Sequence, residues 1–135
     1  MKAMKKISVL ALAVMMVIVG LCACGAKKTV ESYYSDASVA ATMKSQVDGL
    51  REAMSDYYSS IEYSVSGNTF VYEYTFTEEG ESYYDADTTK SGLDAQKDTY
   101  LNSMKSETGV EDTITLVFKY YDSNNSLLDE FTYNN

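Results

Sequence analysis

The chain has no histidine, no tryptophan and no proline, and it has only two cysteines among 135 residues. Without histidine, a serine–histidine–aspartate triad and a zinc site built from cysteine and histidine are both excluded. Without proline, the turns must be built from glycine, asparagine, aspartate and serine. Without tryptophan, the apolar stock rests on thirteen tyrosines and four phenylalanines. Core packing of these rings is therefore the expected source of stability.

Positive charge is also scarce. The chain has 20 Asp and Glu against 11 Lys and Arg, which gives a formal net charge of −9. Such a surface repels phosphate backbones and anionic lipid headgroups, so nucleic-acid binding and a polybasic grip on the membrane are excluded. The ordinary role of this charge is solubility.

The N-terminus has the pattern of a secretory signal peptide. Lys2, Lys5 and Lys6 form a short positive region with no acid, and residues 7–21 are almost wholly apolar. A positive start, an apolar stretch of this length and small residues after it are typical of a cleaved signal. We therefore predict a lipoprotein signal peptide over residues 1–23.

Cys24 is the predicted lipid-attachment residue, because Ala23 before it is small and Leu21 lies three residues upstream. Cleavage before Cys22 would place the bulky Leu21 at the cut. Two acyl chains on one cysteine anchor a protein stably. The alternative is an uncleaved transmembrane helix, since residues 7–24 approach the length of a bilayer span. We expect a lipid-anchored protein at the cell surface, on the outer face of the cytoplasmic membrane, with no cysteine left for a disulfide.

After the cysteine, residues 24–36 are predicted to be a lipidated tether, with a helical turn begun at Thr29, whose side chain can cap a backbone N–H. Residues 37–135 are predicted to form an extracytoplasmic domain. Over residues 37–54 apolar side chains recur every three or four positions, which predicts an amphipathic helix. A second, less apolar helix is predicted to begin at Ser91 or a turn earlier at Asp87. It is expected to stop at Gly109, the residue type that favours a helix end.

Two segments change to an alternation of period two, which is typical of strands. The first runs over residues 61–76 and is interrupted by Gly67 and Asn68, a strong signal for a hairpin turn. The second runs over residues 113–134, with turn-forming residues at 122–126. Each is predicted to form a β-hairpin.

The predicted fold is therefore a two-layer α+β domain of the order helix, hairpin, helix, hairpin, with an antiparallel sheet covered on one face by two helices. The halves also look like copies. The tetrapeptide at 31–34 recurs at 81–84, the two helix faces match at an offset of 50 residues, and the hairpins match at 57. We interpret this as an internal duplication, and chance matching in a chain rich in Tyr and Ser is the alternative.

The densest group of acids lies over residues 78–87 and contains Glu78, Glu79, Glu81, Asp85 and Asp87. Its second half begins like a calcium-binding loop but has lysine where that loop needs glycine, and glutamine where it needs the bidentate glutamate. A glycosidase-like carboxylate pair can also be drawn from these acids, although the chain has no tryptophan platform for sugars. A solvated loop is the favoured interpretation, with no metal or cofactor expected.

The tyrosines are the better indication of function. Tyr63, Tyr72 and Tyr74 are expected mainly in the core, whereas for Tyr121 core and recognition stay equally open. Neighbours on a strand point to opposite faces, so one ring of Tyr120 and Tyr121 should lie outside if the other is inside. Tyrosine is large and rigid with a polar tip, which makes it common at recognition surfaces.

Several short motifs occur together: Cys24 followed by Gly25, the segments KKTVESYY at 27–34 and GNTFVYEY at 67–74, and ETGV at 107–110. With them the chain resembles a family of small lipoproteins from Gram-positive gut bacteria, which is a domain of unknown function. The resemblance covers most of the mature chain. It implies the place and architecture given above and assigns no catalytic or binding residue.

We therefore expect a non-enzymatic binding module whose Tyr- and acid-bearing face meets an extracellular protein, peptide or glycan. The alternatives are a carboxylate-dependent enzyme acting on glycan, and an inhibitor or chaperone-like module for a secreted enzyme.

Overall fold

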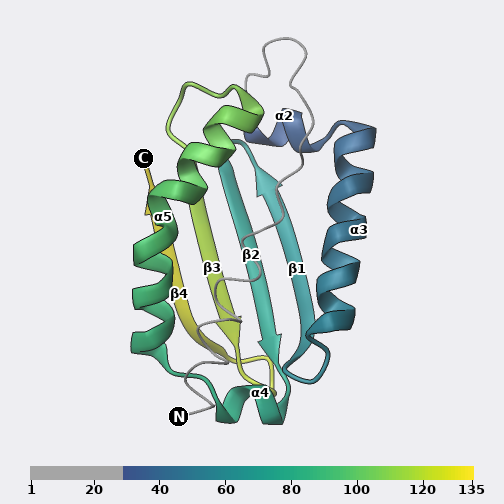
Figure 1. Cartoon of the computed structure of the whole chain (residues 1–135), viewed down its shortest axis with the longest axis vertical. Coiled ribbons are helices and arrows are strands. Elements are labelled where there is room, and N and C mark those ends of the chain that lie inside the picture. Colours follow the sequence, from purple (N-terminus) through teal and green to yellow (C-terminus); the bar gives the residue numbers. More distant parts are fainter. Residues whose placement is uncertain (1–28) are drawn as a thin grey trace.

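The structure, a computed structural model, describes residues 29–135. The predicted signal peptide and Cys24 lie outside the described residues. The chain forms two layers, a four-stranded sheet and the long helices α3 and α5 on one face of it (Figure 1). The elements in order are α2 (Val30–Tyr34), α3 (Ala37–Ala53), β1 (Tyr58–Ser66), β2 (Thr69–Phe76), α4 (Glu78–Ser82), α5 (Ala86–Thr108), β3 (Thr115–Tyr121) and β4 (Leu127–Asn134). The predicted α+β class and element order are confirmed.

Helix α3 follows its prediction closely. Asp36 caps it by accepting hydrogen bonds from the backbone N–H groups of Ser38 and Val39, which would otherwise be unsatisfied at a helix start. The buried stripe consists of Val39, Met43 and Val47. Spacings of four residues bring these side chains onto one face, and that face packs on the sheet beside β1.

Helix α5 begins earlier than Ser91, because Asp85 supplies the cap. Its carboxylate accepts a hydrogen bond of 2.7 Å from the N–H of Thr88. The helix ends at Gly109, whose φ of 71° is the left-handed conformation that favours glycine, so the predicted stop is confirmed. The residues before α5 were predicted to be a loop, but Thr77 caps a short helix there, α4.

Both predicted hairpins form. The first turns at Gly67, whose φ is 57°, and pairs β1 with β2 antiparallel. The second turns at Asn125, whose φ is 65°, and pairs β3 with β4 antiparallel.

The sheet differs from the prediction where the hairpins meet. The strand order is β1-β2-β3-β4, and β2 and β3 run parallel, so the sheet is mixed rather than wholly antiparallel. The reason is the connection between them. A long helix such as α5 carries the chain back to the end of the sheet where β2 began, and a strand that starts there runs parallel to β2.

The parallel pair also bears on the predicted duplication. In the first half the leading strand, β1, lies at an edge, whereas its counterpart β3 lies in the centre of the sheet. Phe70 is fully buried, but its counterpart Leu127 is 53% exposed. The order of elements repeats while the positions in the sheet do not, so an ancestral duplication stays a prediction.

The segment predicted as tether contributes to the domain. Residues 30–34 form α2, which Thr29 caps through a reciprocal pair of hydrogen bonds with Ser32. Val30 is fully buried, and the N–H of Glu31 donates to the carbonyl of Gly67 at 2.9 Å, which holds α2 against the first hairpin turn. The folded domain therefore includes α2 and begins before residue 37.

Aromatic residues make up about half of the core, which lies between the inner face of the sheet and the two long helices. Tyr72 stacks on Phe118 at 5.5 Å between ring centroids, and Tyr74 lies 5.0 Å from Tyr120 on the neighbouring strand. Tyr72 and Tyr74 are buried as expected, and Tyr63 is half-buried. These rings fill the volume that tryptophan supplies elsewhere, which is the role expected for most tyrosines of this chain.

Candidate binding surface

The sheet has a second face that no described helix covers, and we call it the outer sheet face. Side chains alternate along a strand, so the residues between the buried rings of β2 and β3 point to this face. Its two central rows are Ser64–Val71–Val117–Thr132 and Glu62–Glu73–Lys119–Glu130, as the strand register sets them.

The second of these rows, the charged row, has three carboxylates and one cation. Lys119 lies between Glu73 and Glu130, and its Nζ is 3.6 Å from Oε1 of Glu130. Glu62 stands directly opposite Glu73, a like-charged pair that destabilises an antiparallel sheet. The surface therefore retains an electrostatic cost that a binding partner with positive charge would relieve.

Tyr121 lies beside the charged row. Its hydroxyl donates a hydrogen bond of 3.0 Å to Oε2 of Glu73, which comes from the neighbouring strand. Desolvation and this bond to a carboxylate raise the pKa of Tyr121, so the hydroxyl keeps its proton at neutral pH. Tyr120 is 1% exposed and faces the core, so the prediction that these neighbours point to opposite faces is confirmed.

The acids of residues 78–87 are placed differently from what a metal site needs. Asp85 caps α5, and hydrogen bonds from Thr88 lower the pKa of its carboxyl. Glu81 accepts hydrogen bonds from the N–H and the hydroxyl of Ser123 at 2.8 and 3.0 Å, which ties α4 to the second hairpin turn. Within residues 29–135 no three acidic or sulfur side chains gather as a metal site would require. Both acids act as structural groups.

Pairs of tyrosine and carboxylate recur over the whole domain, and sequence reasoning missed them. Besides Tyr121 and Glu73, three pairs join distant elements: Tyr33–Glu107 at 3.1 Å, Tyr84–Asp129 at 2.5 Å and Tyr133–Asp94 at 2.7 Å. In Tyr84 and Tyr133 burial and the acceptor carboxylate raise the pKa of the phenol. The abundance of both residue types is thus partly architectural, and no local pattern marks partners that lie so far apart along the chain.

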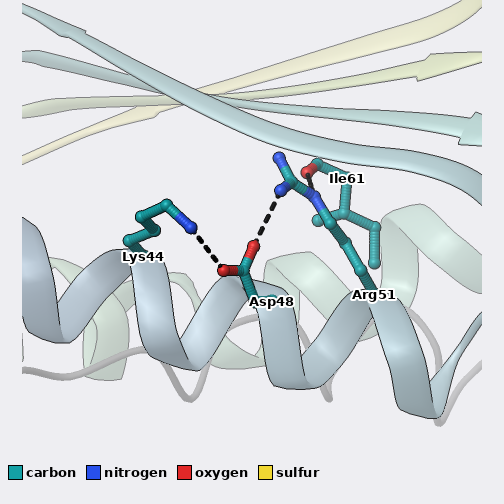
Figure 2. A network of polar contacts seen from close by, with 4 residues as sticks. All are labelled: Lys44, Asp48, Arg51 and Ile61. Carbon is teal, nitrogen blue, oxygen red and sulfur yellow. Dashed lines mark hydrogen bonds and ion pairs between the residues drawn. The ribbon is translucent and has the colours of Figure 1, made fainter.

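The two edge strands of the sheet differ in the side chains that are bonded to them. At β1, the guanidinium of Arg51 on α3 donates through Nε to the carbonyl of Ile61 at 2.7 Å (Figure 2). Oδ1 of Asp48 accepts a hydrogen bond of 2.9 Å from Nη1 of this guanidinium, and Oδ2 accepts one of 2.7 Å from Nζ of Lys44. The bond from Lys44 is the largest cause that lowers the pKa of Asp48. At β4, no described residue occupies the outer edge in this way.

The fold and this surface define a small α+β domain in which the described helices cover one face of the sheet and leave the other uncovered. No helix within residues 29–135 has the length and apolar character needed to cross a membrane. A family model described as "Domain of unknown function (DUF4854)" matches residues 30–133, and the chain belongs to this family. No curated protein and no solved structure gave a match. The family assignment confirms the expectation of a domain of unknown function.

Proposed function

We propose that the protein is a non-enzymatic binding module, anchored by a lipid on Cys24 to the outer face of the cytoplasmic membrane. Its outer sheet face would contact an extracellular protein or peptide that carries positive charge. The observation that supports this is the charged row, in which Glu62 and Glu73 stand opposite each other on the face that the described helices leave open. A like-charged pair in this position lowers the stability of the sheet, and a cation bound beside the two carboxylates would reduce their repulsion.

The group of acids over residues 78–87 offers less to an enzyme. Glu81 and Asp85 are engaged in fixing a loop and a helix start. A glycan is the less supported partner, because sugars are usually held by exposed aromatic platforms. Among residues 29–135 the only ring on the outer sheet face is Tyr121, and its hydroxyl is bound to Glu73.

The binding surface is tested with a fluorescent oligolysine peptide and the full chain in mild detergent. Glu62→Gln and Glu73→Gln should each weaken binding several-fold, because each removes one charge from the row. Glu111→Gln is the matched control, since Glu111 is an exposed acid in the connection between α5 and β3 and makes the same change of net charge. Equal losses in all three variants would mean that only the net charge matters, and would contradict a defined surface.

The anchor is tested separately. Cys24→Ser should abolish incorporation of a labelled fatty acid in the native host, whereas Cys22→Ser should leave it intact. Label that persists in Cys24→Ser would refute the proposed attachment site.

A further inference from the structure

Strand β4 forms an edge of the sheet. It pairs with β3 on one side, and within residues 29–135 no strand pairs with its other side. An edge strand presents a row of unpaired N–H and C=O groups that can join another extended chain, and natural proteins usually block it with lysine, proline, a bulge or a covering element.

The opposite edge shows such blocking. On β1 the pairing is irregular between Tyr58 and Ser60, and Arg51 takes up the carbonyl of Ile61 (Figure 2). Helix α3 packs closely along this strand. A further strand added at β1 would have to displace the guanidinium of Arg51.

Strand β4 is contacted by α5 as β1 is by α3, but no described side chain is bonded to its edge as Arg51 is to β1, and its pairing is regular along most of its length. Leu127–Asn134 contains no lysine, arginine or proline, and residues 129–134 pair with β3 residue by residue. The one irregularity lies at the start of the strand, near Leu128. Leu127 and Leu128 are 53% and 38% exposed, and they are the exposed large hydrophobic side chains of the described domain.

The two sides of β4 differ in chemistry. The exposed Glu130 and Thr132 both point to the outer sheet face. Within the described residues the only ion pair of Glu130 is with Lys119, at 3.6 Å. On the helical side Phe131 and Tyr133 are half-buried, and the ammonium of Lys97 lies 6.0 Å from the ring centroid of Tyr133. A cation is therefore attracted on the outer side, whereas an apolar side chain suits the helical side.

We propose that the edge of β4, with which no strand of residues 29–135 pairs, binds an extended segment of a partner protein as a fifth strand, in which Lys or Arg alternates with apolar residues. Backbone hydrogen bonds would give affinity, and the alternation of charge and apolarity would give specificity. A second copy of this chain suits the edge less well, because its own β4 would bring Asp129 and Glu130 against the same acids. The inference rests on the proposed binding function and adds the place and the kind of partner.

The test uses a capped peptide of about eight residues, a common strand length, in which Lys and Val alternate. Its control has the same composition with all lysines before all valines. The alternating peptide should bind the full chain in detergent, and the block isomer should bind at least about tenfold more weakly, since it cannot match both sides of β4. N-methylation of one alternate set of its amides should abolish binding while methylation of the other set is tolerated, because only one set can face β4. Equal effects of the two methylations would overturn strand addition.

Two lysine substitutions then locate the site. Thr132 and Ser64 are both exposed and lie at opposite ends of the same cross-strand row, three strand spacings or about 14 Å apart. At physiological salt the Debye length is about 8 Å, so a charge at Ser64 is screened from β4. Thr132→Lys should weaken the peptide about fivefold or more, a single added charge at close range, and Ser64→Lys less than about twofold.

The outcomes separate the two proposals. Equal weakening by both lysine variants would place the peptide on the centre of the outer sheet face, which overturns strand addition and keeps the binding function. Dimerisation of the full chain through β4 without peptide would overturn the basic partner. No binding of either peptide would overturn the strand proposal, and a glycan that binds instead would overturn the proposed function as well.

Discussion

The buried hydroxyls of Tyr74 and Tyr120 lower the stability of the core. Both side chains are 1% exposed, and neither hydroxyl has a hydrogen-bond partner within the described part of the chain. An unpaired buried polar group costs about 1–3 kcal/mol. Tyr74→Phe and Tyr120→Phe each remove that cost and keep the ring contact between the two residues, whose centroids are 5.0 Å apart. Each substitution should therefore raise the free energy of unfolding.

We expect a gain of about 1 kcal/mol for each, which corresponds to about 4–8 °C in the melting temperature of a domain of 60–100 residues. The two sites are in contact, so the gains need not add. Tyr84→Phe is the matched control with the opposite sign. Its hydroxyl donates to Asp129 at 2.5 Å, and losing a bond to a charged acceptor should cost about 1.5–3 kcal/mol.

The assay is thermal and urea unfolding of the full chain, followed by circular dichroism. An unchanged urea slope with a shifted midpoint would mean that stability alone has changed. A loss of stability in both Tyr74→Phe and Tyr120→Phe, as large as that in Tyr84→Phe, would refute the reasoning, because it would show that these hydroxyls are well bonded in the native protein.

Gly80→Ala should destabilise the domain by about 2 kcal/mol, since overpacking costs about 1–3 kcal/mol and a Cβ at this site would lie 1.9 Å from the carbonyl oxygen of Tyr57. Gly92 lies on α5, and a Cβ there would have nothing within 4 Å, so Gly92→Ala should raise the free energy of unfolding by about 0.5–1 kcal/mol in the same melts. In alkali the domain should lose stability, because burial raises the pKa of Tyr100 from 10.0 to about 12 and the unfolded chain then releases its proton first. Stability should hold below pH 10 and fall between pH 10 and 12, and a urea midpoint that stays unchanged over this range would contradict this. In acid the sign reverses, because the pKa of Asp85 is lowered from 3.8 and its capping bond is lost as the pH falls below that value. The helicity of the wild type should drop there, and that of Asp85→Asn should drop less.

Much of the fold could be predicted because it is encoded locally. Helix α3 has its apolar spacing and its cap within one stretch, and the Gly67–Asn68 turn needs only its own residues to set the first hairpin. Helix α2 was predicted only as a helical turn begun at Thr29, because a single turn is too short for a periodic signal, and its packing into the domain was not predicted. The burial of Val30 depends on the distant first hairpin, which the α2 backbone reaches through Glu31 and Gly67.

The candidate surface could be predicted only in part. The alternation of Tyr120 and Tyr121 was readable, but the charged row was not, because Glu73 and Lys119 meet only through the parallel register of β2 and β3. Local periodicity carries no information on which hairpin edges pair. The same limit hid the Tyr84–Asp129 bond, whose partners are 45 residues apart.

The most direct test of the binding proposal is a thermal melt of the full chain with three ligand classes: the alternating Lys–Val peptide, a neutral peptide of equal length and wall glycan fragments. A ligand present at 100 times its Kd adds about 2.7 kcal/mol, which is on the order of ten degrees for a domain of this size. We predict a saturable rise with the alternating peptide alone. A rise with the glycan fragments and none with the peptide would contradict the account.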